Sequence, residues 1–231
     1  MFIGTKEHIA QIPDNTRIHV GNSTIVPTTS MKNLGIWFDN CLQFHSHISH
    51  MCKKSIGKLM YINRIKDNFD KQSRITVIHS LFLSNIYYGL KVWGTANATN
   101  IQHAQKVQNF AAKVALGGTK FDHATPYINE LKWLKINKMY QHELAVIVYN
   151  VINKRSPCWL FSLPKVRDTH TLNTRHKYDL YVPKAHTRTG ERSAVISGPK
   201  LWNSLPCHVK NAKCLSTFKR NLKTYLLKSW M

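Results

Sequence analysis

The sequence has few acidic residues. Its 231 residues include 11 Asp and Glu against 33 Lys and Arg, which gives a formal net charge of +22 at pH 7. Small soluble domains carry a net charge of roughly 2 to 8 in magnitude, and a larger excess repels itself unless a polyanion neutralises it. Hydrophobic residues still make up 43% of the chain, which excludes a disordered basic tail. We therefore expect a folded protein whose partner is nucleic acid, with an anionic membrane surface as the second choice.

Cysteines and long apolar runs are also scarce. The five cysteines include no Cys-x-x-Cys pair, so they indicate free thiols in a reducing compartment and not a disulfide scaffold. The N-terminus shows no signal peptide, because no basic segment precedes an apolar core. The longest run without an acid or a base, residues 75–90, is shorter than the ~20 apolar residues that a membrane span needs. We expect an intracellular protein of the nucleus and cytoplasm, neither secreted nor inserted in a membrane.

The positive charge is unevenly distributed along the chain. Residues 1–40 are neutral overall, whereas residues 41–120 carry eleven bases and two acids, and residues 165–231 carry fourteen bases and three acids. No acid occurs between Asp70 and Asp122. A basic surface that is merely solvated is the alternative, but such long windows without acids favour two surfaces that face nucleic acid.

The hydrophobic pattern predicts a mainly α-helical fold with a small N-terminal antiparallel β portion. Strands are expected at residues 1–3, 17–20, 23–26 and 34–38, and a Gly-Asn turn joins the second to the third. Helices are expected at about residues 44–64, 73–88, 100–116, 138–153 and 216–228. Between the last two helices only a short strand at 178–182 is expected. This pattern divides the chain into a β portion (1–40), a helical domain (41–157) and an irregular basic region that ends in a helix (158–231).

Basic residues lie away from the apolar stripes of three predicted helices. On the first helix the apolar residues from Phe44 to Ile62 fall within about 80° of one another at 100° per residue. The basic residues outside the stripes are Lys53, Lys54, Lys58 and Arg64 on the first helix, Lys106 and Lys113 on the third, and Lys219, Arg220 and Lys223 on the last. Such residues can contact phosphates along a nucleic-acid backbone. They are the candidate nucleic-acid-binding residues.

One cluster contains residue types that bind metals: Cys41, His45, His47, His50 and Cys52. Zinc needs four converging ligands, whereas on a helix His47 and His50 lie more than 100° away from the other two helical members. We therefore interpret these residues as the start of a helix that is rich in hydrogen-bonding imidazoles. The alternative, in which the cluster binds metal, would make the protein a metal-dependent nuclease. Two-metal catalysis needs converging carboxylates, and no two of the eleven acids are adjacent. We expect neither a catalytic residue nor a metal site.

Several motifs are more specific than this general pattern. The most specific is Gly198-Pro-Lys-Leu-Trp-Asn-Ser-Leu-Pro206 with Ser216-Thr-Phe-Lys219 downstream. The others are Met1-Phe-Ile-Gly-Thr-Lys6, Lys32-Asn-Leu-Gly-Ile-Trp-Phe-Asp39, Tyr88-Gly89 with Val92-Trp93-Gly94, and residues 106–113. Over nearly the whole chain these motifs resemble the reverse transcriptases of jockey-type non-LTR retrotransposons, in the part that follows the catalytic site.

The resemblance implies the end of the palm, the thumb and the segment after the thumb. Those enzymes hold Mg²⁺ on a Tyr-x-Asp-Asp loop upstream of the Met-x-x-Gly-Thr-Lys strand, and no Asp-Asp occurs in this sequence. The chain would then begin after the catalytic turn, be inactive alone as an RNA-directed DNA polymerase and hold no cofactor. By the same resemblance Leu34, Gly35 and Ile36 would form the hairpin that grips the primer terminus. Lys53, Lys54 and Lys58 would follow the phosphates of an RNA and DNA template–primer duplex.

Two hypotheses of different classes follow. The first is a truncated C-terminal fragment of a retroelement polymerase, which binds template–primer nucleic acid through basic helices and lacks the catalytic centre. The second is a stand-alone basic adaptor, derived from a retroelement, that binds nucleic acid or protein. A reading frame upstream of Met1 that encodes Tyr-x-Asp-Asp would favour the first, and a genuine promoter and start at Met1 would favour the second.

Overall fold

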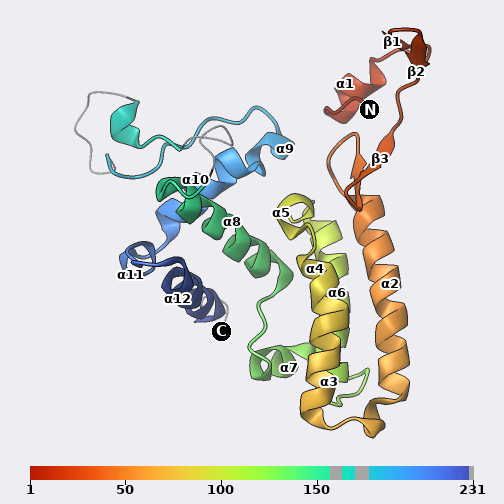
Figure 1. The fold of residues 1–231 in the computed structure, drawn as a ribbon, viewed down its shortest axis with the longest axis vertical. Helices are drawn as coiled ribbons and strands as arrows, with labels where there is room; N and C mark the ends of the chain where they lie inside the picture. Colours follow the sequence, from red (N-terminus) through yellow and green to blue (C-terminus); the bar gives the residue numbers. More distant parts are fainter. Residues whose placement is uncertain (157–162, 170–176, 229–231) are drawn as a thin grey trace. The chain divides into compact units, whose positions relative to one another are not determined.

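A computed structural model describes residues 1–156, 163–169 and 177–228 (Figure 1). The chain forms two compact units, residues 1–131 and 132–231. The predicted fold class is confirmed, because helices dominate and the strands form small antiparallel sheets near the N-terminus. The predicted boundary between residues 157 and 158 lies outside the described residues, and the division into three parts stays a prediction.

Two hairpins form the β portion of the first unit. β1 (Ile18–Val20) pairs with β2 (Ser23–Ile25), as the Gly-Asn turn predicts. β3 (Ser30–Asn33), which the pattern does not predict, pairs with β4 (Ile36–Asp39). The predicted strand at 34–38 therefore begins two residues later, because Leu34 and Gly35 form the turn with φ of 45° and 83°. Positive φ at both central residues is the geometry of a tight hairpin turn whose twist matches that of the strands.

The prediction of a strand at residues 1–3 is wrong. Each hairpin is a two-stranded sheet of its own, and neither extends to the first residues. A short helix, α1 (Lys6–Ala10), follows instead. Thr5 caps this helix, because its hydroxyl oxygen accepts a hydrogen bond from the backbone N–H of His8 at 3.3 Å.

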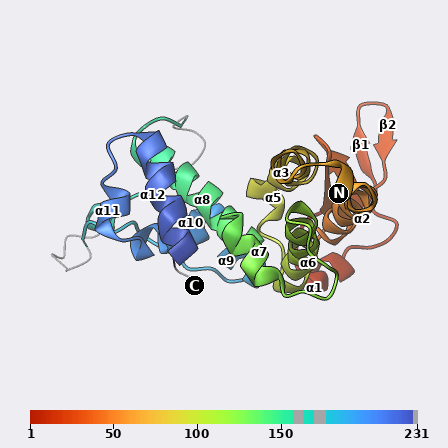
Figure 2. The same cartoon turned by 90° about the horizontal axis from the view of Figure 1, so that it is seen from below.

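Helices supply the core of the first unit. They are α2 (His45–Arg64), η1 (Lys66–Asn68), α3 (Lys71–Ile78), the π-helical η2 (His79–Leu83), α4 (Ser84–Tyr87), α5 (Leu90–Trp93), α6 (Ala98–Ala115) and α7 (Ala124–Glu130). Figure 2 shows α2, α3 and α6 nearly end on, as neighbours. The predicted apolar stripe of α2 is buried, with Ile48 and Leu59 fully inaccessible to solvent. The predicted helix at 73–88 begins at Lys71 after an Asp70 cap, and η2 interrupts its middle.

The second unit packs three longer helices together. They are α8 (Ile136–Ile152), α10 (Ala194–Ser204) and α12 (Leu215–Lys228), with the short η3 (Val166–Asp168), α9 (Arg188–Glu191) and α11 (Cys207–Lys210) between them. The rings of Tyr149 and Phe218 stack with centroids 4.4 Å apart, and the Tyr149 hydroxyl donates to the carbonyl of Ala212 at 3.0 Å. None of the helices in the described part of the chain combines the length and hydrophobicity that a membrane crossing requires.

The predicted strand at 178–182 is reduced to a single bridge between Lys165 and Leu180. The reason lies in Asn203, on α10. Its Oδ1 accepts from the backbone N–H of Leu180 at 3.0 Å, and its Nδ2 donates to the carbonyl of Leu180 at 2.9 Å. One side chain therefore occupies both backbone groups of Leu180. The residues on either side still bond to the 164–167 segment, since Tyr181 N–H donates to the carbonyl of Pro164 at 2.8 Å and Val166 N–H donates to the carbonyl of Asp179 at 2.9 Å.

Candidate nucleic-acid interface

Asp39 joins the second hairpin to α2. Its carboxylate accepts three backbone N–H groups, from Cys41 at 3.1 Å, Gln43 at 2.8 Å and Phe44 at 2.5 Å. This carboxylate therefore satisfies donors where the chain turns from β4 into the helix, and Phe44 there has a φ of +55°. Asp39 therefore stabilises the start of α2 through hydrogen bonds to the backbone.

Three other acids of the first unit are also engaged. Asp70 accepts from two backbone N–H groups as the cap of α3, and Glu130 pairs with Lys71 at 2.6 Å. Asp122 accepts from the hydroxyls of Tyr127 at 2.6 Å and Thr119 at 2.7 Å, and these bonds lower its pKa to about 2. Asp70 and Asp122 satisfy donors at a helix start and in a loop, and Glu130 pairs with Lys71, so none of the three neutralises the basic face of α2.

The basic face of α2 consists of Lys53, Lys54, Lys58 and Arg64. Lys58 is half-buried, and the other three side chains are exposed. Among the residues that the structure describes, no carboxylate forms an ion pair with any of the four. Lys54 and Lys58 are four residues apart and share one flank of the helix, while Lys53 and Arg64 lie on the adjacent flank. The four cations thus lie along three turns of α2, and the exposed Met60 and Tyr61 lie among them.

Leu34, Gly35 and Ile36 have different roles in the β3–β4 turn. Leu34 is 83% exposed, and its carbonyl accepts a hydrogen bond from the hydroxyl of Tyr88. Ile36 is only 7% exposed and packs against Gly89, where a Cβ would overlap its side chain. Ile36 therefore anchors the turn to the core, and only Leu34 and Gly35 are available for direct contact.

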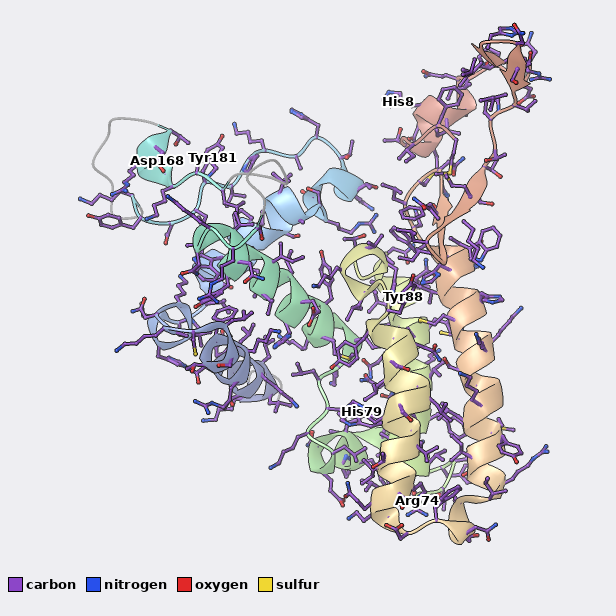
Figure 3. All side chains as sticks on the ribbon, in the orientation of Figure 1. His8, Arg74, His79, Tyr88, Asp168 and Tyr181 are labelled. Atoms are coloured by element: carbon purple, nitrogen blue, oxygen red, sulfur yellow. The ribbon has the colours of Figure 1, made fainter. Side chains whose placement is uncertain are left out.

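A pocket lies between this hairpin and the start of α2. Its volume is about 200 Å³, and it is lined by Lys32, Gly35, Trp37, His47, His50, Met51, Lys54, Asn85 and Tyr88. Tyr88, labelled in Figure 3, lies at the C-terminal end of α4. The pocket brings together only two of the predicted residues, Gly35 and Lys54. In the sequence His47 and His50 stand out only as members of the Cys/His cluster, and no local pattern places the remaining lining residues at a site.

His47 is the buried histidine of the pocket. It is 7% exposed, and its ring centroid lies 6.3 Å from that of Trp93. Burial, and secondly the nearby His50, lower the pKa of His47, so its imidazole is neutral at neutral pH. Its Nε2 atom is buried and has no hydrogen-bond partner among the described residues.

The Cys/His cluster does not converge. Cys52 is buried, which raises its pKa to about 11, and Nδ1 of His45 lies 3.1 Å from Oδ1 of Asn100. Within the described ranges, no three His, Cys, Asp or Glu side chains are placed to hold a metal ion. A polymerase-type magnesium site needs converging carboxylates. The part of the chain that the structure describes offers no such set of carboxylates.

The remaining predicted residues lie on α6 and α12. Lys106 is exposed, but Nζ of Lys113 donates to the carbonyl of Lys120 at 2.9 Å and so braces the loop after α6. On α12, in the second unit, the exposed residues Lys219, Arg220 and Lys223 lie away from the buried stripe. Arg74, labelled in Figure 3, shows how a base can serve the fold, since it donates to the carbonyls of Ala115 and Lys66.

The fold and the site define a mainly helical protein with an unneutralised basic face beside a small aromatic pocket. A sequence comparison finds similarity to the probable RNA-directed DNA polymerase of transposon X-element from Drosophila melanogaster, with 21% identity over 185 residues. The match covers 74% of this chain and 19% of that protein, so the chain corresponds to about a fifth of its length. No family model and no solved structure matches the chain. The similarity supports a relation between this chain and a region of a retrotransposon RNA-directed DNA polymerase.

Proposed function

We propose that the chain is the end of the palm, the thumb and the following segment of a jockey-type non-LTR retrotransposon polymerase, without catalytic activity of its own. In this role it binds RNA and DNA template–primer duplexes through α2 and the β3–β4 turn. The observation that carries the proposal is the basic face of α2, whose four cations have no carboxylate partner among the described residues. The similarity to the transposon polymerase supports nucleic acid as the polyanion.

Phosphate contact by this face has a measurable signature. Each phosphate neutralised by Lys or Arg releases counterions, and the slope of log K against log salt changes by about 0.9 for each contact on a duplex. We therefore expect tight binding of a labelled RNA–DNA duplex at low salt and a steep loss as salt rises. Fluorescence anisotropy over a salt titration measures both.

A matched pair of double variants tests the location of the contact. Lys53→Ala with Lys54→Ala removes two charges from the face, whereas Lys6→Ala with Lys120→Ala removes two exposed charges elsewhere in the same unit. The first variant should lower the salt slope by about 1 to 2, and the second should leave it nearly unchanged. A wild-type chain that ignores the duplex at low salt, or equal losses in both variants, would overturn the proposal.

A further inference from the structure

The pocket beside α2 contains a buried polar atom that nothing in the described structure satisfies. More than nine-tenths of the surface of His47 is buried, and its Nε2 atom has no hydrogen-bond partner there. Buried polar side-chain atoms are nearly always paired with protein or ordered water, and an unpaired one costs free energy. His47 also lines the pocket, so a group bound there lies beside this side chain.

The charges around the pocket select the ligand. Lys32 on β3 and Lys54 on α2 line it from two different elements, and no acidic residue is among its lining residues. Nζ of Lys32 lies 5.8 Å from the ring centroid of Trp37, its cross-strand partner. Two ammonium groups without a carboxylate favour an anion, and lysine is a common ligand of phosphate in proteins.

The shape and the aromatic lining restrict the ligand further. Trp37 and Tyr88 offer ring faces on which a base can stack. The volume of about 200 Å³ is below the roughly 300–1,000 Å³ of pockets that enclose drug-sized ligands, so the pocket can take at most one nucleotide, and part of that nucleotide would lie outside it. A neutral imidazole has one donor and one acceptor nitrogen, which suits the polar edge of a base or a sugar hydroxyl.

We propose that this pocket binds a single nucleoside monophosphate unit, with Lys32 and Lys54 on the phosphate and Nε2 of His47 on the nucleoside. Such a unit can come from a free nucleotide or from an unpaired nucleotide of a bound strand. The second source rests on the proposed duplex binding, and the first does not. Lys54 belongs to both the pocket and the basic face, but Lys32 and His47 line only the pocket and Lys53 belongs only to the face, so substitutions at these three residues separate the two sites.

Isothermal titration of the full chain with adenosine 5′-monophosphate tests the pocket. We expect saturable binding, weakened about tenfold or more by Lys32→Gln, which removes an exposed charge without touching the core. His47→Leu should weaken it several-fold, because it removes the nucleoside contact. Lys53→Gln is the matched control, since it should lower duplex affinity and leave nucleotide binding within twofold.

The outcomes separate the pocket from the duplex-binding face. If wild type binds no adenosine 5′-monophosphate, and a duplex with one unpaired nucleotide binds no better than a blunt duplex, the pocket proposal is overturned while duplex binding can stand. Inorganic phosphate that binds as tightly as the nucleotide overturns the nucleoside part. If the chain prefers the duplex with an unpaired nucleotide but does not bind adenosine 5′-monophosphate, the ligand of the pocket is a nucleotide of a bound strand. If it binds both, the pocket accepts a nucleotide from either source. Unchanged binding in both Lys32→Gln and His47→Leu, each with native circular dichroism, also overturns it.

Discussion

The two β-hairpins of the first unit are alike in their backbone and different in their surroundings. Each is an antiparallel pair of short strands with a glycine at positive φ in the turn, Gly21 at +58° and Gly35 at +83°. Every residue of β1 and β2 is exposed, including the apolar Ile18, Val20 and Ile25. In contrast, no residue of β4 is exposed. Every residue of β3 is exposed as well, so the second hairpin packs into the unit through β4, whereas the first lies on the surface with both strands.

The difference lies in the segment that follows each hairpin. β4 leads directly into α2 through the Asp39 carboxylate, and the ring of Phe38 meets that of Phe44 edge to face with centroids 5.6 Å apart. The Tyr88 hydroxyl holds the turn from α4. An isolated two-stranded hairpin is marginally stable at best in water, so the second hairpin owes its stability to packing on helices. The candidate pocket depends on that packing, because its lining comes from both the hairpin and α2.

The largest expected contrast is between substitution of Gly89, which packs against Ile36 of the second hairpin, and substitution of Gly21, in the turn of the first hairpin. In Gly89→Ala the new Cβ would overlap the side chain of Ile36 at a φ of +66°. Backbone strain and overpacking together should lower the free energy of unfolding by roughly 2–4 kcal/mol. Gly21→Ala has a similar φ but open space around the new Cβ, so it should cost only about 1 kcal/mol of strain. Urea unfolding, followed by far-UV circular dichroism, measures both losses, and equal losses would contradict the comparison.

Substitution of two acids gives the next contrast. Asp39→Ala leaves three backbone N–H groups at the entry to α2 without their acceptor, and we expect a loss of about 2–3 kcal/mol. Asp14→Ala, before the first hairpin, removes an exposed side chain and should change stability by less than about 0.5 kcal/mol. Hydrogen exchange of the first turn of α2 reports the loss locally. Unchanged exchange there in Asp39→Ala would show that the carboxylate is dispensable.

The same contrast explains what the sequence could and could not predict. The first hairpin follows from a Gly-Asn turn between two short β-prone segments, a local signal. The second was only half predicted, because Leu34 at positive φ is not a turn residue by propensity and β3 lacks alternation. The helices α2, α6, α8 and α12 were predicted from their apolar period, which reports burial directly.

α10 was missed for a related reason. It contains Gly198 and Pro199, which break helices by intrinsic propensity. A Cβ at Gly198 would lie 3.0 Å from Cγ2 of Val148 on α8, so the glycine permits the close approach of the two helices. Tertiary packing outweighs propensity here. The pocket was missed because its residues come from β3, β4, α2 and the segment around α4, and no local pattern brings those together.

A smaller contrast is expected between removal of the Tyr88 hydroxyl, which donates to the β3–β4 turn, and removal of the Tyr61 hydroxyl on α2. Tyr88→Phe removes the hydrogen bond to the carbonyl of Leu34, and we expect a loss of about 1 kcal/mol. Tyr61→Phe is the control, since Tyr61 is an exposed tyrosine on α2 and its substitution should cost less than about 0.5 kcal/mol. Amide exchange at Gly35 and Ile36 should accelerate in the first variant only. Equal exchange in the two variants would mean that the turn is held by Ile36 alone.

The smallest effect is expected from removal of the first hairpin. Replacing residues 18–25 with a Gly-Ser linker of equal length removes no buried side chain, because all of β1 and β2 are exposed. The free energy of unfolding should therefore change by less than about 0.5 kcal/mol, and duplex binding should persist. If the replacement instead destabilised α2 as much as Asp39→Ala does, the exposed apolar residues would have to contribute to the core. The two hairpins would then be equivalent parts of one fold, and the packing of the second could no longer explain why the pocket forms beside it.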